Sequence, residues 1–173
     1  MFKAINDLII QYTSYTDPEI FKNYYNNVPL PKNNTFCIIR ELHSKQHTAL
    51  VQKFNYQNIP DKTITVEANQ LTTTHFQVDF YGKDSSIAAT KLATVLECGF
   101  ANDFFISNSY PYTVEDCEQP IQLTNAMDRD NYILRYVVRF SLFNNAIVDQ
   151  TIEGFDEVNI DTVLIETINP SAL

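Results

Sequence analysis

The sequence contains no tryptophan and only three glycines, Gly82, Gly99 and Gly154, among its 173 residues. Because glycine-rich loops are what cradle phosphate groups in nucleotide-binding proteins, this scarcity argues against such a loop. The three cysteines are an odd number without CxxC spacing, which indicates reduced thiols rather than a disulfide framework. No apolar run approaches the ~20 residues that span a bilayer, and the amino-terminal stretch lacks a signal-peptide cleavage site. We therefore expect a soluble chain that does not enter membranes.

Basic residues are scarce in the last third of the chain. Residues 1–114 hold 9 basic and 10 acidic residues, whereas residues 115–173 hold 3 basic and 11 acidic residues, and the formal net charge is −9. An acidic surface repels phosphate, so nucleic-acid binding driven by ion release is not expected. The same charge also keeps a protein soluble, which is the simpler interpretation. Ten tyrosines and twelve phenylalanines favour a folded, strand-rich domain.

Three segments carry helix signals. Residues 2–12 repeat apolar side chains at helical spacing, and Asp17-Pro18-Glu19 is a start signal for a second helix that would continue to Tyr25. A third helix is predicted from about Ser85 to Cys98, with Asp84 or Ser85 as its cap and Gly99 at its end. Its apolar half would contain Ile87, Ala88, Leu92, Val95 and Leu96.

Strand signals begin at Thr35, where the apolar period changes to two. Residues 47–67 are predicted to form a long hairpin with a turn at residues 59–62. Strict alternation at residues 73–81 and 132–142 predicts half-buried antiparallel strands. Residues 101–120 have an irregular pattern, Asn144-Asn145 is predicted as a turn, residues 155–157 as one helical turn, and residues 160–165 as a last strand.

These elements predict the α+β class, because strands and helices do not alternate as they do in parallel doubly wound sheets. The expected architecture is an antiparallel-rich mixed sheet with an amino-terminal helix pair and the helix at about 85–98 packed across the sheet. We expect a single domain over residues 1–173.

For the histidines and cysteines that could bind a metal or act in catalysis, a structural role fits the sequence better than a catalytic one. His43 and His47 have the spacing of two metal ligands on a helix, but they lie between two predicted strands, and a solvated loop is expected instead. Cys98 falls on the apolar half of its helix and is expected to be buried. The acids beside Cys117 would raise its pKa. No nucleophile elbow, P-loop or zinc-protease motif occurs, so neither an enzyme nor a cofactor or metal site is predicted.

One block of sequence resembles a known family. Gln77-Val78-Asp79-Phe80-Tyr81-Gly82, followed by Ser85-Ser86, Ala88-Ala89 and Leu92, resembles the neck or tail terminator family of contractile-tailed phages. The strand Tyr132 to Phe143, the later Phe155-Asp156-Glu157-Val158 and the early Ile5, Leu8 and Ile9 are similar as well. The resemblance covers most of the chain.

The resemblance implies a structural virion protein without catalytic residues. Such proteins form a ring, commonly a hexamer, at the head-proximal end of the tail. The ring stops tube and sheath polymerisation and docks the head-side connector, while DNA passes through without specific binding. The protein would be assembled in the cytoplasm of the bacterial host, and its partners would be copies of itself, tube and sheath proteins, and the connector.

Two sets of residues are candidates for this role. Aromatic anchors and exposed arginines suit a subunit interface, and the interface candidates are Phe54, Tyr56, Tyr110, Tyr112, Arg135 and Arg139. Each has the alternative of serving its own subunit, in the core or on a solvated sheet face. Acids that face a channel would prevent contacts with phosphate, and the channel-lining candidates are Glu115, Asp116, Glu118, Asp128 and Asp130.

Two other functions fit the same size and charge. The chain could be another tail or head-completion component, such as a tube protein that polymerises by itself. It could also be a small acidic immunity-type or adaptor protein, which would stay monomeric and bind one partner through that partner's basic patch.

Overall fold

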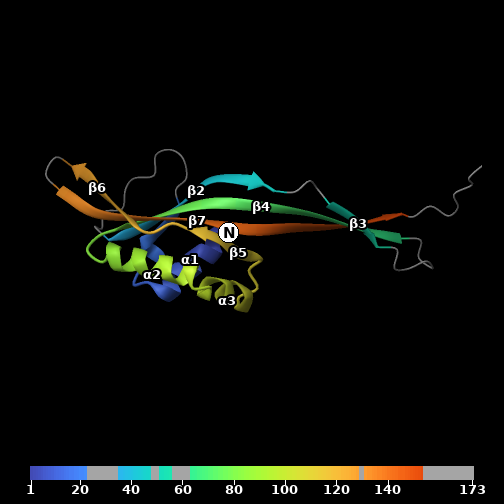
Figure 1. Ribbon diagram of the computed structural model, residues 1–173, viewed down its shortest axis with the longest axis horizontal. Helices are drawn as coiled ribbons and strands as arrows, with labels where there is room; N and C mark the ends of the chain where they lie inside the picture. The colour runs from blue at the N-terminus through green and yellow to red at the C-terminus, as the bar shows by residue number, and fades with distance from the viewer. Residues whose placement is uncertain (23–34, 48–50, 56–62, 129–130, 154–173) are drawn as a thin grey trace, which may run out of the picture. The chain divides into compact units, whose positions relative to one another are not determined.

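The computed structural model describes residues 1–22, 35–47, 51–55, 63–128 and 131–153. In this part of the chain the helices are α1 (Phe2–Tyr12), α2 (Ser85–Glu97) and α3 (Phe100–Ser107), and a 3-10 turn spans Asp17–Glu19. The strands are β1 (Ile20–Lys22), β2 (Phe36–Gln46), β3 (Val51–Asn55), β4 (Thr63–Tyr81), β5 (Tyr112–Cys117), β6 (Ile121–Asp128) and β7 (Asn131–Glu153) (Figure 1). The predicted α+β class is confirmed.

The seven described strands form one mixed sheet in the order β1-β2-β4-β7-β5, with β3 also pairing with β4 and β6 with β7. Strand β4 is antiparallel to β2, and β7 is antiparallel to both β5 and β6. The short β1 is parallel to β2. The sheet is therefore antiparallel-rich, as predicted.

The chain divides into two compact units. The first contains Met1–Val51 and Asn69–Ile147, and the second contains Gln52–Ala68 and Val148–Leu173. In the second unit, Lys53 Nζ lies 3.8 Å from Glu67 Oε1 in an exposed ion pair. The single domain expected over residues 1–173 stays a prediction. The helices and the side-chain contacts of the candidate site belong to the first unit.

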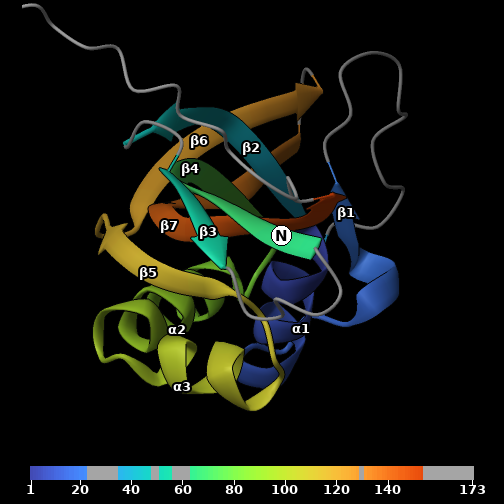
Figure 2. The ribbon, with the colours of Figure 1, turned by 90° about the vertical axis from the view of Figure 1, so that its right-hand side faces the viewer.

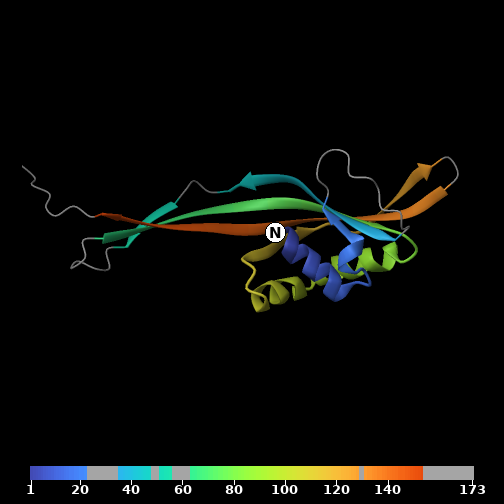
Figure 3. The same ribbon diagram turned by 180° about the vertical axis from the view of Figure 1, so that it is seen from behind.

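The apolar core of the first unit lies between the three helices and one face of the sheet (Figures 2 and 3). Strand alternation directs Phe76, Val78 and Phe80 of β4 to this face. Helical spacing places Ile5 and Leu8 of α1 against them. Burying each such side chain contributes about 1.5–3 kcal/mol, so this layer supplies most of the free energy that holds α1 on the sheet.

Helix α2 packs against the sheet as predicted, and Ala88, Leu92, Val95 and Leu96 of its predicted apolar half are buried. Ala89 and Ala93 are buried, whereas Ile87, which we placed in the core, is 58% exposed. The alanines have small side chains that allow a close approach of the helix to the sheet, and this rotates Ile87 outward. Neither Asp84 nor Ser85 caps the helix with its side chain, because the Ser85 hydroxyl donates to the Gly82 carbonyl at 2.7 Å.

The prediction of a second helix at the amino terminus is wrong. Asp17–Glu19 forms only a 3-10 turn, in which the Thr16 amide donates to Glu19 Oε2 at 2.8 Å. Ile20–Lys22 then pairs with Cys37–Ile39 as an edge strand. A β-branched and an aromatic residue beside an open strand edge gain more from that pairing than from an isolated helical turn.

Residues 101–120 are not irregular as predicted, because they contain most of α3 and all of β5. Ala101, Phe104 and Phe105 have helical spacing and are buried. Asn102 Oδ1 accepts a hydrogen bond from the Val114 amide at 2.8 Å, which joins the helix to the strand. A β-bulge between Val114 and Asp116 breaks the alternation of β5, and this obscured the strand in the sequence.

Strand β7 is longer than its sequence pattern predicts. Asn144 does not form a turn but pairs with Tyr112 of β5. Strand β3 pairs with β4, as expected for the hairpin, and β4 continues without interruption from Thr63 to Tyr81. The predicted turn at 59–62, the helical turn at 155–157 and the strand at 160–165 lie outside the described residues.

Gly99 ends α2 as predicted, and its φ of +81° requires the left-handed region. Nothing lies within 4 Å of a Cβ built there, so conformation alone decides the effect of a substitution. Gly99→Ala should lower the free energy of unfolding by about 1 kcal/mol, because alanine is strained at this φ. Denaturant unfolding measures this loss. Gly99→Asn is the control and should cost less, since asparagine tolerates the left-handed region, and an equal or larger loss for asparagine would contradict the assignment.

Candidate functional site

The sheet face opposite the three helices carries a buried carboxylate. Asp79 of β4 lies next to Ile38 of β2 in the register, on the face away from the main core. Its side chain is 0% exposed, although the sequence pattern placed it on a polar face. A charge without access to water must be paired, so the neighbouring strands have to supply cations.

Two arginines supply these cations from the strands on either side. Arg135 of β7 donates to Asp79 Oδ1 from Nη2 at 3.0 Å and from Nε at 3.3 Å. Arg40 of β2 brings its Nε within 3.0 Å of Asp79 Oδ2, but these two atoms are not aligned for a hydrogen bond. The Arg40 contact is therefore mainly an ion pair, whereas the Arg135 contact is a charge-assisted hydrogen bond.

The network continues from Asp79 towards β5. Gln77 Nε2 donates to Asp79 Oδ1 at 3.0 Å, and Gln77 Oε1 accepts from Arg139 Nε at 3.1 Å. Arg139 Nη1 then lies 3.8 Å from Glu118 Oε2, and both side chains are about half exposed. The charged contacts thus run from a fully buried centre to a hydrated end.

The histidines border this face rather than a loop. The predicted loop is wrong, because His43 lies in β2, where its ring stacks on that of His75 with centroids 4.2 Å apart. His47 follows β2, and its Nε2 lies 2.6 Å from Thr73 Oγ1. The end of β2 has polar side chains on both faces, so no alternation marked it as a strand. Within the described ranges, no group of three or more His, Cys, Asp or Glu could hold a metal ion.

The cysteines differ in their environments. Cys98 is exposed, so the prediction of a buried thiol is wrong, because the residue caps the end of α2 instead of facing the sheet. Cys117 is half-buried, and burial together with Glu97, Asp116 and Glu118 raises its pKa to about 12. Burial also raises the pKa of Cys37, which lies in the core. The predicted effect of the acids on Cys117 has the correct direction, with burial as the larger cause.

The structure places two of the interface candidates at the edge of the core. Tyr110 and Tyr112 are partly buried and stack with centroids 6.3 Å apart. The Tyr110 hydroxyl donates to Asp7 of α1, and this hydrogen bond raises the pKa of Tyr110. The Tyr112 hydroxyl accepts from the Met1 amino group at 2.8 Å. The side chain of Phe54 and all of Tyr56 lie outside the described residues.

Arg135 and Arg139 differ in how much of each remains available to a partner. The Arg135 side chain is 13% exposed and engages Asp79, whereas the Arg139 side chain is 46% exposed. Glu115, Asp116 and Glu118 are exposed, and the last two line a hollow of about 310 Å³ with Arg139 and the two stacked histidines. The side chains of Asp128 and Asp130 lie outside the described residues. The roles proposed for all of these residues stay predictions.

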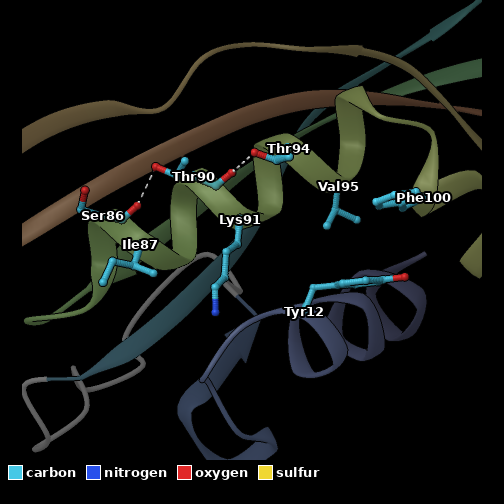
Figure 4. A pocket seen from close by; sticks show the side chains of 8 residues that line it. All are labelled: Tyr12, Ser86, Ile87, Thr90, Lys91, Thr94, Val95 and Phe100. Atoms are coloured by element: carbon cyan, nitrogen blue, oxygen red, sulfur yellow. Dashed lines mark hydrogen bonds between the residues drawn. The ribbon is translucent and has the colours of Figure 1, made fainter.

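Sequence reasoning missed an apolar hollow on the helix side. Tyr12 of α1, Val95 of α2 and Phe100 of α3 line it together with Ile87, and its volume is about 540 Å³ (Figure 4). Phe100 and Ile106 are 55% and 73% exposed, which is unusual for such large apolar side chains. The failure to recognise α3 in the sequence concealed this surface. The available signal was the helical spacing of Phe100, Phe104 and Phe105.

A second set of exposed apolar side chains lies on β6 and β7. Ile121 and Leu123 of β6 and Leu134 of β7 are each more than a third exposed. Ile121 pairs with Val137, and Leu123 pairs with Arg135, so both lie on the charged face of the sheet. Leu134 lies on the other face. The described residues therefore expose apolar side chains on the helices and on these strands, and also at Ile10, Leu42, Ile147 and Val148.

The described groups are arranged for packing and charge pairing. A comparison with protein families matches residues 1–167 to the family described as phage neck terminator protein. The chain belongs to this family. The resemblance found in the sequence is thus confirmed, and membership implies a protein of the virion neck or tail. It is a family of structural phage proteins, which is consistent with the prediction of a non-enzymatic role. A comparison with curated proteins gave no match.

No helix in the described part of this terminator-family chain is long and apolar enough to cross a membrane.

Removing the charge of Asp79 should destabilise the fold strongly. Asp79→Asn leaves Arg135 and Arg40 without their counter-charge, and losing one partner of a buried ion pair costs about 3 kcal/mol or more of unfolding free energy. Denaturant unfolding followed by circular dichroism measures this. The control is Glu118→Gln, which breaks only the half-exposed pair with Arg139 and should cost less than about 1 kcal/mol. Equal losses for the two variants would show that Asp79 is not the centre of the network.

The two cysteines outside the core should react at different rates. At mildly alkaline pH, iodoacetamide should alkylate the exposed Cys98 quickly and Cys117 slowly, because a pKa raised to about 12 leaves almost no Cys117 thiolate. Mass spectrometry of peptides from the native protein gives both rates. Denatured protein is the control, in which the two rates should converge. Faster labelling of Cys117 than of Cys98 in the native protein would contradict this environment.

Proposed function

We propose that this member of the phage neck terminator family forms a ring at the head-proximal end of the tail. The ring, a hexamer in this proposal, stops polymerisation of the tube and sheath and docks the head-side connector. Membership over residues 1–167 supports the neck location. The ring, its contact with the tube and sheath, and its contact with the connector are proposals that go beyond family membership.

The observation that carries this proposal is the presence of exposed apolar side chains on several separate elements. A ring subunit that ends a tube has to contact its neighbours in the ring and a different partner along the tail axis. A closed ring itself uses two different patches of each subunit. The apolar side chains exposed on α2 and α3 and those on β6 and β7 lie on different elements and meet this need for several contacts. A monomeric adaptor with one partner requires only one such surface.

The exposed acids suit a channel through which DNA passes. Asp116 and Glu118 lie on the sheet face away from the helices, and Glu115 is exposed at the bulge of β5. Carboxylates facing the passage would repel phosphate and prevent adhesion of DNA. In this proposal the sheet side therefore faces the channel and the helices face outward. An image of the ring with these three acids on its outer rim would overturn the orientation.

The proposal is tested by deleting the gene from the phage. Without a terminator, tube and sheath polymerisation should continue, so electron micrographs should show abnormally long tails and tails without heads. Supplying the wild-type gene in trans is the control and should restore tails of normal length. Normal infectious particles from the deletion would reject the terminator function.

Light scattering after size exclusion, followed by electron microscopy, examines the ring itself. A ring of the purified protein, or one formed on isolated tail ends, is the expected result. Long polymers of the protein alone would indicate a tube protein instead, and a monomer that binds no tail end would indicate an adaptor.

A further inference from the structure

The hollow on the helix side has the form of a docking groove. Its walls come from α1 and α2, with Phe100 of α3 closing one end and Ile87 near the other (Figure 4). Tyr12 faces Val95 across the space. Paired helices with apolar side chains along the seam between them bind a segment of another chain through its apolar residues.

The two threonines of the groove, Thr90 and Thr94, do not call for polar partners. The Thr90 hydroxyl donates to the Ser86 carbonyl at 2.9 Å, and the Thr94 hydroxyl donates to the Thr90 carbonyl at 2.8 Å (Figure 4). Both hydroxyl protons are thus used within α2, and the methyl groups of the threonines add to the apolar wall. A groove with such a wall favours an apolar binding partner.

Lys91 is the exception, because it places a cation inside this apolar wall. It lies between Ile87 and Val95 on α2, and its amino group extends into the hollow (Figure 4). Among the described residues, none forms an ion pair with Lys91. An occupant that buried this amino group without a carboxylate would pay its desolvation cost, so the groove selects an apolar segment that carries acids.

The last twenty residues of the chain have this chemistry. Residues 154–173 contain no lysine or arginine, and their acids are Asp156, Glu157, Asp161 and Glu166. Apolar residues lie between these acids, and they include Phe155, Val158, Ile160, Val163, Leu164 and Ile165.

We propose that the groove of one copy binds residues 154–173 of a neighbouring copy, with Lys91 paired to an acid of that segment. This contact joins two different parts of the same chain, as a closed ring requires. It rests on the proposed ring and assigns the groove on the helix side to a neighbouring copy.

Zero-length carbodiimide crosslinking tests the contact directly, because it joins a lysine amine to a carboxylate that touches it. Full-length protein labelled with nitrogen-15 is mixed with unlabelled protein, and crosslinked peptides are identified by mass spectrometry. The expected product joins Lys91 to one of the acids at 156, 157, 161 or 166 and contains one labelled and one unlabelled peptide. Absence of this product, or its formation only within one isotopic species, overturns the inference.

A charge-reversal series supplies a second measurement. Lys91→Glu should weaken self-association roughly tenfold in sedimentation, since it sets a like charge against the segment. The matched control is Lys83→Glu, an equal charge change at an exposed lysine that does not line the groove, and it should leave association unchanged. Combining Lys91→Glu with Asp161→Lys and Glu166→Lys should restore association. Equal association of wild type and Lys91→Glu overturns the groove contact.

The two proposals fail in different ways. If the deletion phage has long tails but Lys91→Glu rings are as stable as wild type, the terminator function stands and the groove contact falls. If the deletion phage is normal while the Lys91 crosslink forms between copies, the contact stands as a self-association site and the terminator function falls.

Discussion

A carboxylate without access to water is held between arginines from two different strands, and the arrangement of the sheet depends on it. Asp79 reaches Arg40 on one side and Arg135 on the other, so one charge ties β2, β4 and β7 together. A buried ion pair adds little net stability over an apolar substitute, but any register that separated its partners would leave a bare charge in a dry environment. A one-residue slip of β4 would also move Phe76 and Val78 out of the core. The ion pair and the apolar face therefore demand the same register.

The two faces of the sheet consequently have different tasks. One face is covered by α1, α2 and α3 and supplies the core, whereas the other carries the charged network and becomes more hydrated from Asp79 to Glu118. Covering one face with helices leaves those helices with an outer surface, and in this chain that surface is apolar where Ile87, Phe100 and Ile106 lie. A protein that worked alone would gain nothing from exposing them. A part of an assembly can use them.

Sequence patterns correctly predicted the helices and strands that bury one face and expose the other. Helix α1, the core of β4 and the first part of β7 have regular apolar spacing, and the structure has them where expected. The prediction failed where a second influence competes with that spacing. The bulge at Glu115 concealed β5, polar residues on both faces concealed the end of β2, and pairing with Tyr112 overrides the turn tendency of Asn144.

The candidate sites were harder to predict because their residues come together only in the fold. Arg135 and Asp79 are 56 residues apart, and nothing local in the sequence links them. The sequence could place Asp79 on the face opposite Phe80, but alternation cannot distinguish a face covered by water from one covered by arginines. The aromatic residues Tyr110 and Tyr112 were recognisable as anchors, yet their contacts with Asp7 and Met1 depend on where α1 lies.

The distribution of charge favours the proposed contact between copies. Residues 115–173 hold only three basic residues, and two of them, Arg135 and Arg139, contact Asp79, Gln77 and Glu118 within the sheet. The acids of residues 154–173 have no lysine or arginine within their own segment, and Lys91 is one cation that the described residues leave unpaired. The overall charge of −9 keeps free copies apart at long range, so association has to rely on short-range apolar contact with a local charge match. An apolar groove with a single lysine meets both conditions, because it offers area to the apolar residues of the segment and only one place for a carboxylate.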